Sequence, residues 1–308
     1  MKKVLFPLLL LVILIVSACS NDKAAEKETN SPADDTKSET ITYESETGPV
    51  EVPADPQRVI LLSGFTGNVI DLGVNIVGVD QWSKMNPRLQ EELKDVEEVS
   101  DENLEKIIEL DPDLIIGLSN IKNIEKLKEI APTVTYTWGK SDYLTQHIEI
   151  GKLLNKEKEA TEWVEDFQKR AQLTGEKVQQ KIGEDATVSV VESSEKQLFV
   201  FGDNWARGTE ILYQAMKLKM PDKVKEVALK PGYYAISPEV LPEYAGDYIV
   251  FSKNADADNS FQETETYKNI PAVKNNHVFE MNAKEASFSD PITLEDQLKF
   301  FEKSFLDN

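Results

Sequence analysis

The sequence has very little of the chemistry on which enzymes and metal sites usually depend. Its 308 residues include one cysteine, Cys19, and two histidines, His147 and His277, so neither an internal disulfide nor a Cys/His metal cluster is expected. It contains no G-x-S-x-G nucleophile motif and no G-x-x-x-x-G-K-[ST] phosphate loop. We therefore predict no catalytic residues, no metal ligands and no cofactor. A carboxylate pair such as Asp203 and Glu210 leaves a surface hydrolase as an alternative.

Positive charge is also scarce. The chain has 34 Lys and Arg against 55 Asp and Glu, which gives a formal net charge of −21. Such a surface repels nucleic acid, so we predict no nucleic-acid partner. It also disfavours long-range capture of highly anionic ligands, although a local pocket can override that effect. The chain has four arginines, namely Arg58, Arg88, Arg170 and Arg207.

The N-terminus has an apolar run that is too short to span a membrane. Lys2 and Lys3 precede 13 apolar residues, 4–16, where a spanning helix needs about 20. This pattern predicts a signal peptide over residues 1–18. Small residues directly before Cys19 resemble a lipobox, which predicts lipidation (palmitate) of Cys19; a plain signal peptide with an incidental cysteine is the alternative. Residues 19–40 then lack large apolar side chains and predict a flexible tether. The expected location is the extracellular face of a cell membrane, on a lipid anchor, in a Gram-positive type of cell.

The rest of the chain predicts an α/β fold. Short apolar strands alternate with helical segments, a pattern typical of parallel sheets. We predict an N-terminal α/β lobe over 41–155 and a C-terminal α/β lobe over 184–308. Between them, apolar residues recur every three or four positions from Glu157 to Ile182, which predicts one long bridging helix over 156–183. Gly175 lies inside this helix and would permit a kink.

A short internal repeat links the two lobes. At a spacing of 134 residues (239 − 105), Glu105 matches Glu239, Asp113 matches Asp247, and Ile115 matches Ile249. In both copies a capping residue opens a short helix with an acid in its first turn, and an aspartate then leads into a strand. The repeat predicts two lobes of related build.

Aromatic side chains concentrate where strands are predicted to end. Trp82, Trp138, Phe199, Trp205 and Phe288 lie in loop-like regions or at strand ends, and ligands of α/β sheets bind at the carboxyl ends of strands. For Phe201, Tyr233 and Tyr234, core packing is an equal alternative. The segment "FGDNWARGTEIL", residues 201–212, combines turn-forming glycines with Trp205 and the planar donor fork of Arg207. It predicts one wall of a binding cleft.

These features together resemble the substrate-binding lipoproteins of class III ABC importers for iron–siderophores. The resemblance covers residues 2–306, and "LFVFGDNWARGTEILYQAMKLKMP", "EYAGDYIV", "NIPAVKNNHVF" and "FSDPITLEDQL" are similar to the ferric-hydroxamate-binding branch. It implies a fold of two Rossmann-like lobes joined by one long helix. It also implies an extracellular receptor that binds a ferric siderophore and acts in iron transport as a monomer. The implied partners are a membrane permease and its ATPase.

The resemblance also implies roles for individual residues. Arg207 would hydrogen-bond the hydroxamate oxygens with Trp205 beside it, and Phe199, Trp138, Trp82 and Phe288 would line the walls. Glu105 and Glu239 would dock to arginines of the permease. Close members of the family have tyrosine at the position of Phe199, and the loop before Asp290 keeps only Phe288 of its aromatic residues. The alternatives on the same fold are a citrate-hydroxamate, a catecholate siderophore, or haem with Tyr233 or Tyr234 as axial ligand.

Overall fold

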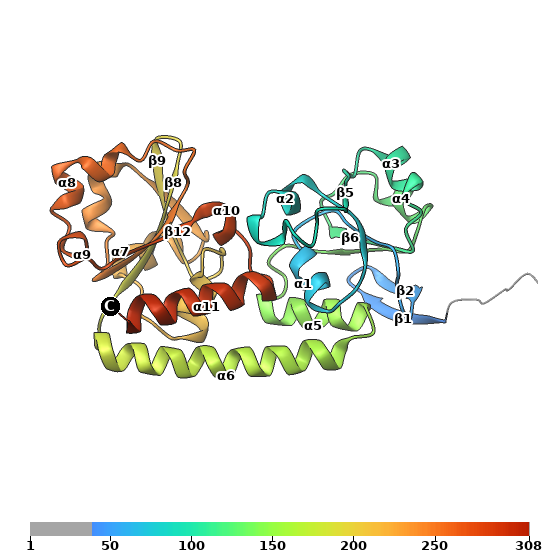
Figure 1. The fold of residues 1–308 in the computed structure, drawn as a ribbon, viewed down its shortest axis with the longest axis horizontal. Helices are drawn as coiled ribbons and strands as arrows, with labels where there is room; N and C mark the ends of the chain where they lie inside the picture. Colours follow the sequence, from blue (N-terminus) through green and yellow to red (C-terminus); the bar gives the residue numbers. More distant parts are fainter. Residues whose placement is uncertain (1–38, 308) are drawn as a thin grey trace, which may run out of the picture. The chain divides into compact units, whose positions relative to one another are not determined.

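Two five-stranded sheets organise residues 39–307, the part of the chain that this computed structural model describes (Figure 1). The predicted signal peptide, Cys19 and nearly all of the predicted tether lie outside the described residues. We call the part built on the first sheet the N-lobe and the part built on the second sheet the C-lobe. The described residues belong to one compact unit.

The N-lobe sheet is parallel throughout, as the alternation of strands and helices predicts, with strand order β5-β4-β3-β6-β7. The residues of β3, β7 and most of β6 are buried, which explains their nearly continuous apolar runs. The predicted hairpin forms a separate antiparallel pair, β1 with β2. The strands are β1 (Thr40–Ser45), β2 (Gly48–Pro53), β3 (Val59–Leu61), β4 (Ile76–Val79), β5 (Glu97–Glu98), β6 (Leu114–Leu118) and β7 (Thr133–Tyr136). The helices are α1 (Thr66–Asp71), α2 (Gln81–Lys84), η1 (Pro87–Leu89), α3 (Leu104–Glu109), α4 (Ile124–Lys128) and α5 (Tyr143–Leu153).

The C-lobe sheet is mixed, with strand order β10-β9-β8-β11-β12. Strands β8, β11 and β12 are parallel, whereas β9 runs antiparallel to both β8 and β10. The cause is the link between β8 and β9, which is only the pair Glu195-Lys196, and a parallel connection needs a crossover of a dozen or more residues. The strands are β8 (Val188–Ser194), β9 (Gln197–Phe201), β10 (Tyr233–Ile236), β11 (Tyr248–Lys253) and β12 (Val278–Asn282). The helices are the π-helix η2 (Glu210–Ala215), α7 (Asp222–Ala228), η3 (Pro238–Glu243), η4 (Ser260–Glu263), α8 (Glu265–Lys268), α9 (Pro271–Lys274), α10 (Ala283–Ala286) and α11 (Pro291–Leu306).

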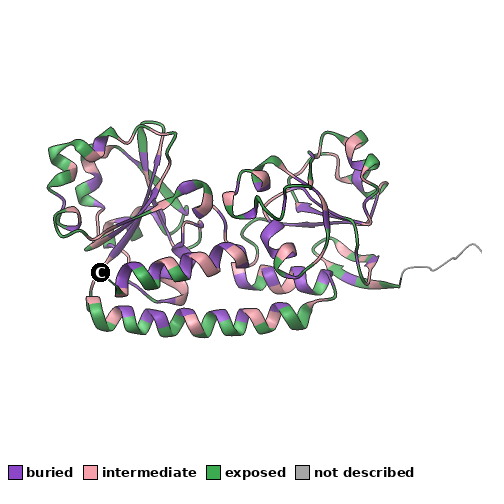
Figure 2. Cartoon of the chain, viewed as in Figure 1, coloured by how far each residue is buried: buried purple, intermediate pink, exposed green. Residues whose placement is uncertain are grey.

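Helix α6 (Glu157–Ile182) is the predicted bridge, and its 26 residues rise about 39 Å. Buried and exposed residues alternate along it in Figure 2, because one apolar face packs against α5 and α11 while the other face meets solvent. The helix runs without interruption through Gly175. A Cβ at this position would come within 2.5 Å of the Cα of Met216, so Gly175 permits a close backbone approach rather than a kink.

The internal repeat has a clear structural counterpart. In the N-lobe, the carboxylate of Asp113 accepts the backbone N–H of Gln57 at 2.6 Å and that of Arg58 at 2.9 Å, at the start of β3. In the C-lobe, the carboxylate of Asp247 accepts the N–H and the hydroxyl of Thr187, both at 2.8 Å, at the start of β8. Each aspartate precedes the strand that pairs in parallel with that neighbour. The two lobes therefore repeat one device that fixes the register of adjacent strands.

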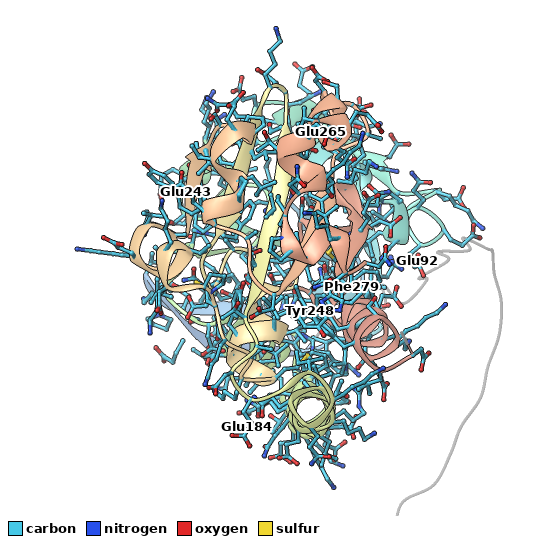
Figure 3. The ribbon with its side chains drawn as sticks, turned by 90° about the vertical axis from the view of Figure 1, so that its left-hand side faces the viewer. Glu92, Glu184, Glu243, Tyr248, Glu265 and Phe279 are labelled. Carbon is cyan, nitrogen blue, oxygen red and sulfur yellow. The ribbon has the colours of Figure 1, made fainter. Side chains whose placement is uncertain are left out.

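Aromatic side chains fill the core of the C-lobe between its sheet and α11. Tyr248 and Phe279 lie side by side in Figure 3, with ring centroids 6.0 Å apart, and Phe305 packs edge-on against Phe279 at 4.9 Å. The glutamates labelled in the same view, such as Glu184, Glu243 and Glu265, point away from this core. These three acidic side chains lie on the outside of the lobe, in keeping with the strongly negative charge of the chain.

Candidate functional site

The loop after β9 has an unusual backbone. Ala206, Arg207 and Gly208 follow one another in the left-handed region, with φ of 58°, 59° and 79°. Side chains with a Cβ rarely adopt this conformation, so surrounding contacts must hold it. The N–H of Ala206 donates to the Glu210 carboxylate at 2.9 Å, and the N–H of Arg207 donates to the carbonyl of Ala286 at 2.7 Å. At Gly208 a Cβ would overlap the ring of Phe301, so only glycine fits there.

Glu210 is the buried support of this loop. Besides Ala206, its carboxylate accepts the hydroxyl of Thr209 at 3.0 Å and that of Ser289 at 3.1 Å. Burial raises the pKa of Glu210 above its usual value, and these hydrogen bonds oppose the rise. Its two oxygens are directed at donors of the protein itself. The geometry thus gives Glu210 a structural role in holding the loop backbone.

Arg207 is held by a carboxylate that sequence reasoning did not select. Its Nε and Nη2 donate to the two oxygens of Glu192, both at 2.9 Å, and Nη1 donates to the carbonyl of Trp205 at 3.2 Å. The guanidinium also stacks on Phe201, with its central carbon 4.9 Å from the ring centroid. These bonds use three of the five N–H groups of arginine, and the other two make no hydrogen bond within residues 39–307. No motif pointed to Glu192, because a single acid in "VVESS" reads as an ordinary strand end.

An aromatic cluster that includes Trp205 of the Arg207 loop reaches across the two lobes. Trp205 packs against Tyr233 at a centroid distance of 5.3 Å, and Phe199 lies 5.7 Å from the same tyrosine. Trp138, which follows β7 of the N-lobe, meets Trp205 edge-on at 6.0 Å. The structure therefore brings together three predicted wall residues, Trp138, Phe199 and Trp205. Trp138 remains 63% exposed and Tyr233 43% exposed, so both present open surface beside the contact.

Tyr233 belongs to this cluster, whereas Phe201 is a core residue. Tyr233 lies opposite Phe201 in the pairing of β10 with β9, and Phe201 is buried. Tyr234, the next residue along β10, packs instead against Tyr244. The paired "YY" of the sequence cannot show which ring joins the cluster, because successive side chains of a strand point to opposite faces.

A second aromatic pair joins the lobes at Trp82 and Phe288. Their ring centroids are 5.3 Å apart. Phe288 is only 7% exposed, so Trp82, at 45%, presents most of the free surface of this pair. Arg88 lies close by in η1 and bridges the lobes again through ion pairs with Glu285, at 2.7 Å, and Asp296.

Two recesses lie at opposite ends of the N-lobe sheet. One of about 450 Å³ lies at the carboxyl ends of β3, β4 and β5 and is lined by Asp80, Trp82, Glu98 and Asp101 among others. A larger one of about 590 Å³ lies at the amino ends, beside Arg58 and Asn75. Ligands of open α/β sheets bind at the carboxyl ends, and the aromatic pairs lie there too, so the smaller recess is the one that adjoins the site.

The two glutamates of the repeat occupy equivalent exposed positions. Glu105 is the second residue of α3 and Glu239 the second residue of η3. A hydrogen bond from the side chain of Ser237 lowers the pKa of Glu239. Within residues 39–307 neither glutamate is part of an ion pair, so both carboxylates are open to a cationic partner.

Residues 39–307 offer neither a clustered metal site nor a membrane-spanning helix. In this range no three His, Cys, Asp or Glu side chains are grouped so that they could hold a metal ion. Over the same residues, no helix has the length and apolar character that crossing a membrane requires.

The chain is similar to known proteins over most of its length. The family described as "Periplasmic binding protein" matches residues 60–285. The iron(3+)-hydroxamate-binding protein FhuD of Bacillus subtilis is 36% identical, with 96% of this chain and 95% of FhuD covered. YxeB of the same organism, also an iron(3+)-hydroxamate-binding protein, is 35% identical, with 97% and 95% covered. The solved structure of FhuD2 from Staphylococcus aureus with bound ferrioxamine B is 33% identical, with a TM-score of 0.77 over 82% of this chain and 99% of FhuD2.

The fold and these matches define a substrate-binding protein with two α/β lobes and a long bridging helix, a class that is not enzymatic. The chain belongs to the periplasmic binding protein family and, within it, to the group of FhuD and YxeB, the substrate-binding components of ABC iron–siderophore importers. More distant relatives are described as lipoproteins.

Proposed function

We propose that this protein binds a ferric hydroxamate siderophore at the Arg207 site and delivers it to an ABC permease. One observation carries the proposal: a planar guanidinium with two N–H groups unused by the described residues is bonded to Trp205, whose ring packs against partly exposed aromatic rings of both lobes. Such a surface suits a ligand that has oxygen acceptors at its centre and apolar chains around them.

The chemistry of the ligand explains what the protein supplies. In a trihydroxamate complex the six hydroxamate oxygens fill the coordination sphere of Fe(III), so the protein needs donors for those oxygens rather than ligands for the metal. Arg207 would provide the donors, and Trp205, Trp138 and Phe199 would pack on the carbon chains. Tyr233, with its hydroxyl and its contacts to Trp205 and Phe199, joins this set. Trp82, supported by Phe288, would close the opposite wall.

The relatives support the same ligand class. FhuD and YxeB of Bacillus subtilis are named for iron(3+)-hydroxamate binding, and FhuD2 of Staphylococcus aureus was solved with ferrioxamine B. This chain matches them over most of its length at 33–36% identity.

Delivery to a permease requires an anchor and a docking surface. We infer that Cys19 is lipidated and holds the protein, as a monomer, at the extracellular face of the cell membrane. Glu105 and Glu239 would then pair with cations of the permease, one from each lobe. Their equivalent positions and exposed carboxylates support this assignment.

Tryptophan fluorescence of the full mature chain tests the proposal, because Trp205 is in the Arg207 loop and Trp138 packs against Trp205. Ferrioxamine- and ferrichrome-type complexes, ferric citrate, a ferric catecholate and haem would be titrated in parallel. We expect saturable quenching at submicromolar concentration by the hydroxamate complexes. Binding of haem alone, or of catecholates alone, would overturn the proposal.

A further inference from the structure

We propose that Glu192 is a specificity-determining residue: it cancels the charge of Arg207 and thereby makes the site discriminate against anionic iron chelates. The inference rests on the proposed function, since it concerns the ligand class that the Arg207 site accepts. The inference assigns a role to Glu192, whose carboxylate binds Arg207 but leaves two of the guanidinium N–H groups without a partner among the described residues.

The position of Glu192 is fixed by three strands. It lies on β8, opposite Phe199 of β9 and Ser252 of β11, so the three side chains share one face of the sheet. Its carboxylate accepts two hydrogen bonds from Arg207, both at 2.9 Å, and a third from the Ser252 hydroxyl at 2.7 Å. The side chains of Glu192 and Arg207 are 12% and 17% exposed. The pair is thus bidentate, closely packed and largely shielded from solvent.

This arrangement cancels the charge of Arg207 but leaves the guanidinium able to donate hydrogen bonds. A lone, poorly solvated guanidinium would attract any anion strongly, because Coulomb interactions grow as water is excluded. With Glu192 bound edge-on, the pair carries no net charge, while two N–H groups of Arg207 still point elsewhere. A neutral chelate can accept those hydrogen bonds, but an anionic chelate gains little attraction and also meets the carboxylate.

Most cations near the aromatic walls do not supply a free positive charge. The other cations on the segments that carry the aromatic walls are mostly paired with carboxylates: Arg88 with Glu285 and Asp296, Lys140 with Glu46, and Lys284 with Asp256. Lys84, on α2, donates to the carbonyl of Leu93. The recess beside Trp82 is lined by the acids Asp80, Glu98 and Asp101 and by no lysine or arginine. The surroundings of Arg207 therefore reinforce the effect of Glu192.

The ligand class follows from charge balance. Three hydroxamates each contribute one negative charge, so their complex with Fe(III) is neutral, and it becomes cationic when the chain ends in a protonated amine. Citrate- and catecholate-based complexes carry net negative charge. Glu192 therefore favours neutral and cationic trihydroxamate complexes over anionic ones.

The test compares Glu192→Gln with Glu192→Asp in the full mature chain. The first removes the charge and the second keeps it, whereas Glu195→Gln, on the exposed turn after β8, is a matched loss of charge away from Arg207. Affinities would be measured for ferrichrome (neutral), ferrioxamine B (cationic) and two anionic probes, ferric citrate and a ferric citrate-hydroxamate. The readout is the ratio of anionic to neutral affinity, which a merely structural role would leave unchanged.

We expect this ratio to rise roughly tenfold in Glu192→Gln, as one unscreened charge at close range can produce, and to stay near the wild-type value in Glu192→Asp and Glu195→Gln. Equal weakening of all ligands by Glu192→Gln would show a structural role and overturn the inference. If that variant does not fold, the salt dependence of the wild type decides: affinity for the anionic chelates should not fall as salt rises, and a fall would reveal an uncancelled cation. A wild type that binds no hydroxamate complex would refute the proposed function itself, and this inference with it.

Discussion

The side chain of Asp290 lies directly against the backbone of Gly67, so that the cap of helix α11 touches helix α1 of the other lobe. Asp290 accepts the N–H of Thr293 at 3.1 Å and its hydroxyl at 2.9 Å, which fixes the carboxylate in place. A Cβ at Gly67 would come within 2.7 Å of the Cβ of Asp290 and would overlap its carboxylate. Both residues are buried, so neither can move aside easily.

Replacing Gly67 with alanine should therefore destabilise the protein. Helix propensity alone would favour alanine by about 1 kcal/mol, but overpacking a buried contact typically costs about 1–3 kcal/mol. We expect a net loss of about 1–2 kcal/mol in the free energy of unfolding, measured by chemical denaturation. In an Asp290→Gly background, which removes both the Cβ and the carboxylate at a tolerated N-cap residue, the same substitution should cost much less. An equal cost in both backgrounds would show that Asp290 is not the obstacle.

Loss of the Arg207 side chain should weaken ligand binding. Hydrogen bonds that involve a charged group contribute about 1.5–3 kcal/mol, so Arg207→Ala should reduce affinity for a ferric hydroxamate by roughly ten- to a hundredfold. Arg207→Lys keeps the charge but loses the planar fork, and it should recover only part of the affinity. Tryptophan quenching measures both variants. Full affinity in Arg207→Ala would place the ligand elsewhere.

The buried carboxylate of Glu210 should make stability fall as pH rises. Burial raises its pKa in the folded state above the ordinary value of 4.5, so from that pH upward the unfolded chain releases a proton that the folded protein still holds. The stabilisation is fully present below pH 4.5 and is lost as the pH rises through the folded-state pKa. Relative to Glu210→Gln, the wild type should thus lose stability over this range. Unfolding free energies of both proteins in a pH series check this, and a constant difference between them would contradict it.

Substitution of Glu105 and Glu239 should impair transport without affecting ligand binding. Exposed ion pairs typically contribute about 0.2–1 kcal/mol, so each change to alanine should weaken permease binding by up to about fivefold, and the double variant by more. The control is Glu109→Ala, which removes an exposed acid from the same helix, α3. Iron uptake by cells and ligand affinity in solution would be measured together. A fall in affinity, or a similar transport defect in Glu109→Ala, would argue against docking.

Sequence periodicity predicted those elements of the fold that carry a long, regular pattern of apolar residues. The apolar face of the bridging helix is long enough to place both of its ends, and the helix spans the predicted Glu157–Ile182. The spacing of Asp113 and Asp247 likewise predicted two related lobes. The antiparallel β9 and the role of Gly175 were not predicted, because strand direction and backbone approach depend on neighbours that are distant in the sequence.

For the candidate site, the sequence singled out some of the residues that the structure brings together and missed others. Tryptophans and an arginine near strand ends stand out in a sequence, and the structure does bring Trp138 to Trp205 and Trp82 to Phe288. Glu192 and Tyr233 do not stand out, because an acid or a tyrosine within a strand is common on any sheet. Their position beside the aromatic cluster comes from register, which places Glu192 next to Phe199 and Tyr233 opposite Phe201.

Helix α6 fixes the distance between the two lobes. A continuous helix of about 39 Å resists bending, and both lobes are tied to it through α5 and α11. The separation between an acid on the N-lobe and its counterpart on the C-lobe is therefore largely set by the length of this helix. A permease that contacts both lobes would meet nearly the same spacing whether the receptor is empty or loaded. The permease would then have to distinguish the empty receptor from the loaded one by smaller differences, such as how tightly the two lobes are held together.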